Sequence, residues 1–245
     1  MQRLRLIPSL SLSGEDLVQT HKYSARQYVG DPINVFRIFN DKGVDEISLT
    51  DIDASRYFRK PNFRLLENIV SESFIPVTYG GGIHDVETAR TLFEIGIEKI
   101  AVNATAQSNP ERLLQLVGAF GSQSIVGVVD VTVKELSAIN YLNSSIISPV
   151  GIMLHQFVES GVGEIRLNDV NRDGTLSGLN IDFFSTISRE FDVPIVVSGG
   201  TSSVKDIRRA SQSGINAIAV GAMVVLYGPH RAVLVSYPNW REQNE

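Results

Sequence analysis

FNDKGVDEISLTD at residues 39–51 returns as FVESGVGEIRLND at residues 157–169, and the match runs on without a gap to residues 104 and 222. At the same offset, Pro76, Gly81, Gly82, Gly96, Ile100 and Val102 recur as Pro194, Gly199, Gly200, Gly214, Ile218 and Val220. Two copies of one half therefore make up most of the chain. Corresponding loops of the two halves are expected to have similar functions, so the repeat suits a ligand with two similar ends.

The repeat also sets the order of secondary structure, because short runs of β-branched residues alternate with segments of helical period. This alternation predicts a parallel sheet covered by helices. Eight strands are expected, at residues 4–12, 46–52, 76–79, 99–103, 124–131, 164–167, 194–198 and 217–221. Helix starts are expected at Asp31-Pro32, Asn109-Pro110 and Ser148-Pro149, and helix ends at Gly43, Gly96, Gly161 and Gly214.

Eight strand–helix units built from a duplicated half predict an α/β fold, a (β/α)₈ TIM barrel with a two-fold internal half-barrel repeat. An open doubly wound sheet is the second choice, but such sheets rarely show so regular a duplication. The 245 residues are expected to form a single barrel domain, residues 1–245. The segment HRAVLVSY at residues 230–237 departs from the repeat, because it resembles a strand more than a closing amphipathic helix.

The composition limits the class of protein and its chemistry. A net charge of −5 argues against a nucleic-acid partner, and no apolar run approaches the length of a membrane span. Residues 1–12 lack a signal-peptide cleavage site, so a cytoplasmic protein is expected. With no cysteine, the chain has no disulfide, thiolate metal site or cysteine nucleophile. The histidines show no metal-ligand spacing, and neither a metal nor a cofactor is expected.

Glycine loops follow strands at matching places in the two halves. The loop residues are, in chain order, Gly81 and Gly82, Asn103 and Ala104, Gly199 and Gly200, and Gly221 and Ala222. Glycines just before a helix let a phosphate approach backbone N–H groups and the positive end of the helix. These are therefore candidate phosphate-binding residues for a ligand with two phosphates. Tight turns without a ligand are the alternative.

Carboxylates end several of the expected strands. Asp130 ends the fifth strand, and its repeat mate in the first strand is Ser11. General acid–base catalysis in a barrel needs two titratable groups facing each other across the mouth, so these two are the candidate catalytic positions. A lone aspartate at a strand end could equally cap a loop. Asp51, Asp173 and Ser198 are candidate substrate-loop residues, and an Asx turn explains Asp173 as well as a ligand contact does.

Charged residues recur at the opposite ends of the strands. Arg5 lies at the start of the first strand, and Glu46, Lys99 and Glu164 begin the second, fourth and sixth. Together they could form a ring of alternating sign around the lower opening of the barrel. The pattern alone favours a structural salt-bridge cluster that closes the core.

Several longer motifs resemble a known family. The start RLIPSLSLSGEDLVQT, the strand end LTDIDAS, the loop VTYGGGIHD, the segment NATAQSNPERL, and the loops NRDGTLSG and VSGG are similar to the cyclase subunit of imidazole glycerol phosphate synthase. The resemblance covers almost the whole chain. It implies a lyase-type synthase on a barrel fold, with a phosphorylated small-molecule ligand that carries two phosphates.

The same resemblance implies a partner and a route for ammonia. Members of the family receive ammonia from a glutaminase subunit docked at the bottom, N-terminal face of the barrel. A gated ring of Arg, Glu, Lys and Glu passes the ammonia upward, and the matching residues here are Arg5, Glu46, Lys99 and Glu164. The resemblance therefore favours an ammonia gate over a purely structural cluster.

Two positions depart from the family. Its catalytic pair is an aspartate at the end of the first strand and another at the end of the fifth, where this chain has Ser11 and Asp130. Gln19 stands where the family has a lysine that contacts the substrate. Loss of a general base lowers a rate by roughly 10²–10⁴-fold, so independent cyclase activity is expected to be lost.

Residues 28–53 and the ending GPHRAVLVSYP resemble more closely a paralogous branch found with bacterial surface-polysaccharide genes. This resemblance implies that ammonia is used, with an ATP-dependent amidotransferase, to turn an acetamido group of a nucleotide-linked sugar into an acetamidino group. A cyclase of histidine biosynthesis is the alternative, and it would need Asp130 to act with Asp51 or Asp173. A phosphosugar isomerase or a non-catalytic binding module of the same fold is the third hypothesis.

Overall fold

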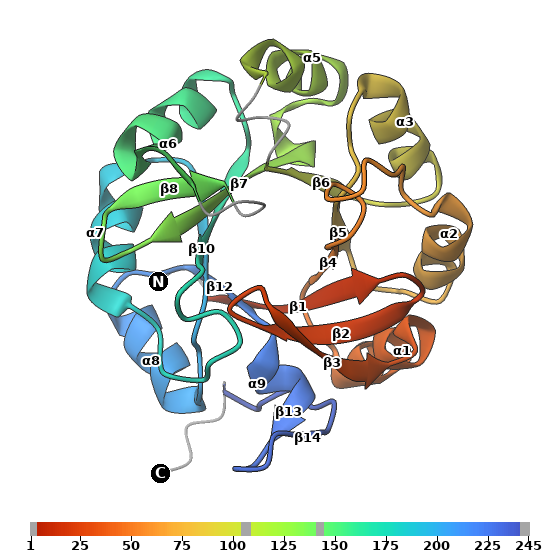
Figure 1. Ribbon diagram of the computed structural model, residues 1–245, viewed down its shortest axis with the longest axis vertical. Coiled ribbons are helices and arrows are strands. Elements are labelled where there is room, and N and C mark those ends of the chain that lie inside the picture. Colours follow the sequence, from red (N-terminus) through yellow and green to blue (C-terminus); the bar gives the residue numbers. More distant parts are fainter. Residues whose placement is uncertain (1–3, 104–108, 141–144, 241–245) are drawn as a thin grey trace.

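Eight parallel strands close into a barrel surrounded by helices, as Figure 1 shows. The computed structural model describes residues 4–103, 109–140 and 145–240. The barrel strands are β1 (Arg5–Ser13), β4 (Ile47–Asp51), β5 (Val77–Gly80), β6 (Lys99–Val102), β7 (Ile125–Thr132), β10 (Glu164–Asp169), β11 (Ile195–Ser198) and β12 (Ala217–Val220). Each pairs in parallel with the next in this order, and β12 pairs back to β1. The predicted (β/α)₈ barrel is confirmed.

Helices cover the outside of the barrel. They are α1 (Pro32–Lys42), α2 (Phe63–Ser71), α3 (Val86–Glu94), α5 (Pro110–Phe120), α6 (Val150–Glu159), α7 (Ile181–Glu190), α8 (Val204–Gln212) and the short α9 (Ala222–Val225), with a 3₁₀ turn η1 (Ser122–Ser124). Asp31 caps α1 by accepting a hydrogen bond from the Asn34 backbone N–H at 2.8 Å, as predicted from Asp31-Pro32. Gly43 ends the same helix in the left-handed conformation.

The helix predicted to start at Ser148-Pro149 begins one residue later, and the expected cap by Ser148 is absent. Pro149 ends strand β9 (Ser145–Pro149), and α6 begins at Val150 without a side-chain cap. The proline lies at the strand end because the preceding residues pair with β8 (Ser137–Asn140), and proline at a strand edge removes no ladder hydrogen bond.

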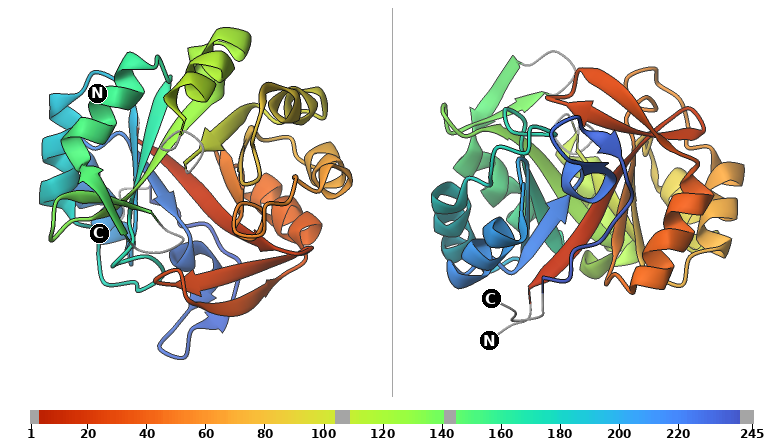
Figure 2. Two further views of the ribbon diagram at one scale, coloured as in Figure 1. Left: turned by 45° about the horizontal axis from the view of Figure 1, so that its top comes forward. Right: turned by 90° about the horizontal axis from the view of Figure 1, so that it is seen from below.

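Two hairpins were not predicted from the sequence, and both extend the first strand of a half. Strands β2 (Asp16–His21) and β3 (Ala25–Gly30) follow β1, and β8 and β9 follow β7. They therefore occupy equivalent places in the two halves of the barrel. The right-hand view of Figure 2 shows both hairpins at the end of the barrel away from the start of β1.

The end of the chain departs from the strand–helix pattern, as predicted. Within residues 230–237 only β14 (Ala232–Val233) is a strand, and it pairs with β13 (Leu226–Tyr227) after a four-residue α9. The side chain of Tyr237 returns to the barrel, where its hydroxyl donates to the Leu6 carbonyl at 3.0 Å. A hairpin and an irregular segment thus replace the last closing helix.

Successive side chains along each strand point to opposite faces, and this divides the core into two parts. On β1, Leu6, Leu10 and Leu12 join the large apolar cluster between the barrel and its helices. Ile7 points the other way, into the lumen, where it meets a small apolar cluster that includes Val196. The other inward positions of β1 are Arg5, Ser9 and Ser11, so the lumen contains polar groups at several levels. A single domain, residues 1–245, stays a prediction.

Candidate functional site at the barrel mouth

A pocket opens at the carboxyl ends of the barrel strands, and we call it the mouth pocket. Of the candidate residues it contains Ser11, Asp51, Gly81, Gly82, Asn103, Asp130, Asp173, Ser198 and Gly221. A smaller hollow beside it is lined by Gly199, Gly200, Gly221, Ala222 and Asp173. The fold thus brings candidate residues of both halves to one place. Ala104 lies outside the described residues.

Asp130 lies in the mouth pocket with its carboxylate enclosed by donors. It accepts hydrogen bonds from the Tyr23 hydroxyl at 2.7 Å, from the Asn168 amide at 2.9 Å and from the Asn103 amide. Burial raises the pKa of Asp130, and these hydrogen bonds oppose the rise only in part. The carboxyl group can therefore exchange a proton closer to neutral pH than an exposed aspartate can.

Ser11 lines the same pocket from β1, so the first strand supplies a hydroxyl and no carboxylate at this position. One of the three donors to Asp130, the hydroxyl of Tyr23, comes from the turn of the β2–β3 hairpin. Burial, followed by the nearby charge of Asp130, raises the pKa of Tyr23, so its hydroxyl stays protonated and donates. Tyr23 was not predicted from the sequence, because nothing in the spacing of residues shows that the hairpin folds back over the mouth.

The hairpin is held over the mouth by the loop after β10. Thr20 donates to the Asp173 carboxylate at 2.9 Å, and the Lys22 backbone N–H donates to the Asp173 carbonyl at 2.9 Å. Burial raises the pKa of Asp173, which lines both the mouth pocket and the smaller hollow. Asp173 therefore joins the hairpin to the pocket. Gln19, also on the hairpin, is buried beside Gly221.

Asp51 and its repeat mate Asp169 turn back onto the loops that follow their strands. Asp51 accepts from the backbone N–H groups of Asp53 and Ala54, both at 2.9 Å, and Asp169 accepts from the Asn171 N–H at 3.2 Å. Each carboxylate thus stabilises a turn in the manner of an Asx motif. Asp51 still lines the mouth pocket, whereas Asp169 is 2% exposed.

The glycine loops have a structural reason to lack side chains. A Cβ at Gly81 would lie 2.4 Å from the Asp51 carbonyl oxygen, and a Cβ at Gly199 would lie 2.5 Å from that of Asp169. Both glycines also have positive φ angles, +114° and +110°. The close approach of two backbones therefore explains these glycines, and it keeps the loops next to the mouth pocket free of side chains.

Arg166 and Asn168 of β10 also line the mouth pocket, and neither was predicted from the sequence. Arg166 donates to Asn168 Oδ1 at 2.9 Å, to Ser48 Oγ at 2.7 Å and to Ser9 Oγ at 2.6 Å. Burial lowers the pKa of Arg166, but a guanidinium remains charged in proteins. The alternation Glu164, Arg166, Asn168 in the sequence was the available signal, since it indicates a polar inward face on this strand.

At the bottom of the barrel the four predicted charged residues meet. Arg5 contacts Glu46 at 3.1 Å and also pairs with Glu164, while Lys99 contacts Glu46 at 3.3 Å and Glu164 at 3.7 Å. The ion pairs form a closed cycle of alternating sign, which we call the ring. Burial lowers the pKa of Arg5, but the charges of Glu164 and Glu46 outweigh burial and raise it above its ordinary value.

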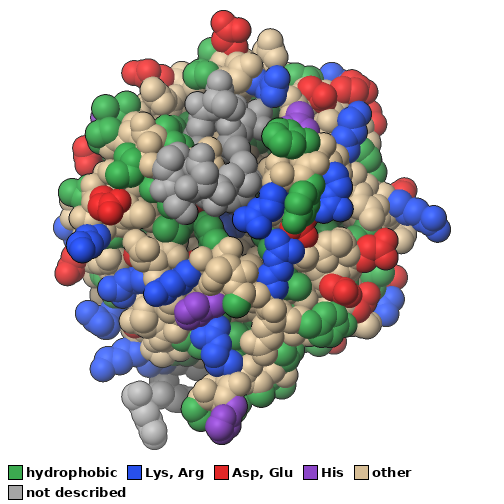
Figure 3. Space-filling model, in the orientation of Figure 1, with side chains coloured by type: hydrophobic (Ala, Val, Ile, Leu, Met, Phe, Trp, Pro, Cys, Tyr) green, Lys and Arg blue, Asp and Glu red, His purple; other side chains and the backbone are tan. Residues whose placement is uncertain are grey.

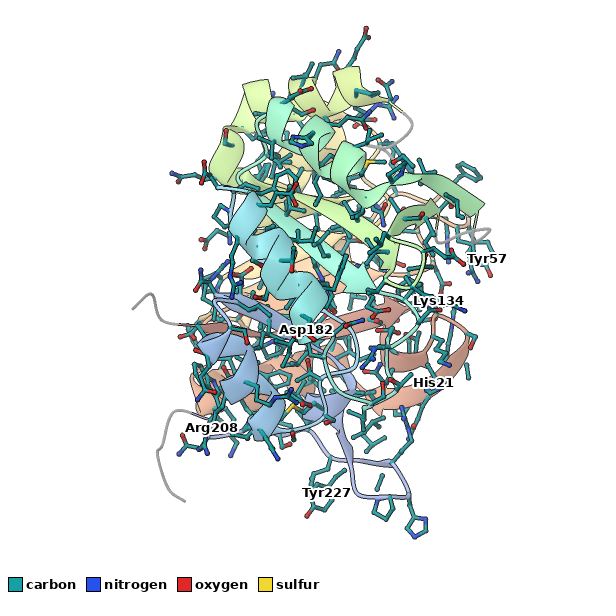
Figure 4. All side chains as sticks on the ribbon, turned by 90° about the vertical axis from the view of Figure 1, so that its left-hand side faces the viewer. His21, Tyr57, Lys134, Asp182, Arg208 and Tyr227 are labelled. Carbon is teal, nitrogen blue, oxygen red and sulfur yellow. The ribbon has the colours of Figure 1, made fainter. Side chains whose placement is uncertain are left out.

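The face around the mouth is basic although the chain carries a net charge of −5. Its exposed basic residues, on the β2–β3 hairpin and on the loop between β4 and α2, are Lys22, Arg26, Arg56, Arg59 and Lys60. Figure 3 shows Lys and Arg side chains on this face near the centre of the molecule. In Figure 4, His21, Tyr57 and Lys134 project from the same edge of the molecule, although they come from three separate segments.

Some further findings limit the chemistry of the site. Within residues 4–103, 109–140 and 145–240, no three His, Asp or Glu side chains gather in a way that could hold a metal ion. In the same ranges, no helix is both long and apolar enough to cross a membrane.

Comparison with known proteins identifies the family. A family model described as "Histidine biosynthesis protein" matches residues 5–229. The chain is 39% identical, over 98% of its length and 97% of the other, to a Pseudomonas aeruginosa protein named "Putative imidazole glycerol phosphate synthase subunit hisF2". It is 35% identical to "Imidazole glycerol phosphate synthase subunit HisF" of Helicobacter hepaticus, over 91% of this chain and 90% of that one. The chain therefore belongs to the histidine biosynthesis protein family, among relatives of the HisF subunit of imidazole glycerol phosphate synthase.

Proposed function

We propose that this chain is the synthase-side subunit of a glutamine amidotransferase complex that conducts ammonia rather than consuming it. A partner glutaminase docks at the bottom face, and ammonia passes the ring and leaves at the mouth. The ammonia serves the amidination of an acetamido sugar in the biosynthesis of a surface polysaccharide such as lipopolysaccharide O-antigen. An ATP-dependent amidotransferase is the enzyme that uses it.

The observation that carries this proposal is the serine at position 11. A cyclase of this family needs a second carboxylate opposite Asp130, and a serine hydroxyl cannot act as a carboxylate base near neutral pH. The groups in contact with Asp130 are instead donors: the amides of Asn103 and Asn168, and the hydroxyl of Tyr23, whose pKa is raised. The mouth pocket thus lacks the acid–base pair, while the ring at the bottom has all four of its charged residues.

The ring supports an entrance for ammonia from a separate protein. Glutaminases of the partner class use a cysteine nucleophile, and this chain contains no cysteine, so it cannot release ammonia from glutamine in that way. The ion pairs join Arg5 and Lys99 to the same two carboxylates, so a shift of either cation opens the cycle without leaving a glutamate unpaired. Docking of the glutaminase at the bottom face would shift one of these two cations and open the ring.

The acceptor is proposed on other grounds. Residues 28–53 and 228–238 resemble the branch associated with surface-polysaccharide genes, and the exposed basic residues of the mouth face suit a phosphate-bearing compound or the acidic surface of its enzyme. In the reaction, ATP activates the amide oxygen of the acetamido group, ammonia adds to the carbon, and the oxygen leaves with the phosphate-containing fragment.

Cyclase activity in histidine biosynthesis is the second candidate. It is favoured by the enclosed Asp130 and by Asp51 and Asp173, which line the same pocket. Against it, Asp51 holds two backbone N–H groups and Asp173 holds the hairpin. Neither carboxylate is free to replace the missing base without loosening a loop.

The test reconstitutes the chain with a glutaminase, an ATP-dependent amidotransferase, a nucleotide-linked acetamido sugar, ATP and glutamine. Mass spectrometry should detect replacement of the acetamido oxygen by NH, and omission of this chain should abolish glutamine-dependent product but spare ammonium-dependent product. Equal glutamine-dependent product without this chain would refute the proposal. Efficient turnover of the imidazole glycerol phosphate synthase substrate by the chain would support the second candidate instead.

A further inference from the structure

Arg166 crosses the lumen of the barrel from one strand to the opposite one. In the closed strand order, β10 and β4 are separated by three strands on either side, so they face each other across the full width of the barrel. The Arg166 guanidinium on β10 donates to Ser48 on β4 and to Ser9 on the neighbouring β1. Ser48 is the repeat mate of Arg166, so one half supplies a long cation where the other supplies a small acceptor.

Ser9 and Arg166 line the mouth pocket, so this crossing lies above the ring, at the inner end of the pocket. Glu164, Arg166 and Asn168 alternate on β10 and therefore point into the lumen at three successive levels, about 7 Å apart. Glu164 belongs to the ring, and Asn168 donates to Asp130 in the pocket. Any molecule that moves up the lumen from the ring to Asp130 must pass the level of Arg166.

The contacts of Arg166 are suited to breaking and reforming. Among the described residues, no carboxylate lies within ion-pair distance of its guanidinium, and its hydrogen-bond acceptors are two hydroxyls and an amide. Glu46 attracts it from below, and Asp130 and Asp173 attract it from above. Release from the two serines therefore separates no salt bridge, and carboxylates on both sides can stabilise the displaced cation.

We propose that Arg166 is a second closure of the lumen, above the ring, and that ammonia reaches the mouth only when its side chain leaves Ser9 and Ser48. This inference rests on the proposed function, which supplies the ammonia. It assigns Arg166, at the inner end of the mouth pocket, a control of passage that is separate from the ring.

The experiment uses one variant that strengthens the contact between Arg166 and Ser48 and another that removes the Arg166 cation. Ser48→Asp gives Arg166 a carboxylate partner across the lumen, and Ser48→Asn is the matched control, because it has the same size without the charge. Arg166→Met removes the cation and keeps an unbranched side chain of similar length. Should Ser48→Asp fail to fold, Ser9→Asp and Ser9→Asn make the same comparison from β1.

The readout is an isotope competition in the reconstituted system, with amide-¹⁵N-labelled glutamine against unlabelled ammonium in the bulk solution. The ¹⁵N fraction of the amidinated sugar measures how much ammonia came through the lumen. A charge-assisted hydrogen bond is roughly twice as strong as a neutral one, so Ser48→Asp should lower that fraction by about tenfold. Ser48→Asn should lower it much less, and Arg166→Met should match or exceed the parent.

The outcomes separate the two proposals. Three results would overturn the closure and leave the proposed ammonia conduit intact. These are a ¹⁵N fraction that is unchanged in all variants, a ¹⁵N fraction that falls equally in Ser48→Asp and Ser48→Asn, and a ¹⁵N fraction that falls in Arg166→Met. The proposed function and the closure would both be overturned if the parent protein gave product only from bulk ammonium. They would also both be overturned if it gave no product from either source of nitrogen.

Discussion

Replacing Tyr23 with phenylalanine removes one hydrogen bond from the carboxylate of Asp130 and leaves the ring in place. Asp130 is 2% exposed, so water restores the missing donor poorly. A hydrogen bond to a charged group stabilises a protein by roughly 1.5–3 kcal/mol, and one between neutral groups by roughly 0.5–1.5 kcal/mol. Because the pocket admits some solvent, we expect Tyr23→Phe to lower the free energy of unfolding by about 1.5 kcal/mol at neutral pH.

The loss should depend on pH in a definite direction. The folded-state pKa of Asp130 is raised by burial, so the native state holds its proton to a higher pH than the unfolded chain does. Below the unfolded pKa the carboxyl is neutral in both states, and the loss from Tyr23→Phe should shrink to about 0.5–1 kcal/mol. As pH rises through the folded pKa, the carboxylate forms and the loss should grow.

Urea denaturation at a series of pH values measures this difference, with Tyr28→Phe as the matched control. Tyr28 lies on the same hairpin with 60% of its surface exposed, so its hydroxyl should contribute almost nothing at any pH. A hydrogen bond to a buried, titrating carboxylate is refuted if the loss in free energy of unfolding caused by Tyr23→Phe does not depend on pH. It is also refuted if that loss is no larger than the loss caused by Tyr28→Phe.

Three further outcomes are expected. Gly81→Ala should lower the free energy of unfolding by about 1–3 kcal/mol, because its Cβ would meet the Asp51 carbonyl at 2.4 Å. Gly118→Ala, at an exposed position in the last turn of α5, should raise the free energy of unfolding by up to about 1 kcal/mol, and chemical denaturation checks both. Crystals soaked in sulfate should show anions at the two glycine loops, and empty loops at high sulfate would remove the phosphate-site proposal. Ser11→Asp should restore at best part of a cyclase activity that is negligible in the parent, because Gln19 also differs, as a steady-state assay with ammonium would show.

The barrel could be predicted because its signal is local and repeated. Each strand is a short apolar run, each helix begins or ends at a recognisable residue, and the second half repeats the first. Gly43 and Asp31 illustrate this, since each acts within a few residues of its own position. The hairpins gave no such signal, because their short strands are partly exposed and gain their order by extending β1 and β7.

The site could be predicted only where a residue's role follows from its strand. Asp130 and the four residues of the ring lie at strand ends, so a barrel brings them together without further information. Tyr23 reaches Asp130 only because the hairpin folds over the mouth, and Arg166 reaches Ser48 only because the barrel closes. Long-range contacts of this kind depend on the tertiary structure.

The central claim is that ammonia enters this chain at the ring, and the Lys99→Ala variant tests it most directly. Lys99 contacts both glutamates of the ring with 19% of its side chain exposed, so its removal weakens the ring inside the barrel. The measurement is the number of sugars amidinated per glutamine hydrolysed, with glutaminase affinity determined alongside it. The account predicts a changed ratio with nearly unchanged affinity. A ratio equal to that of the parent in both Lys99→Ala and Arg5→Ala, or no binding of a glutaminase at all, would contradict it.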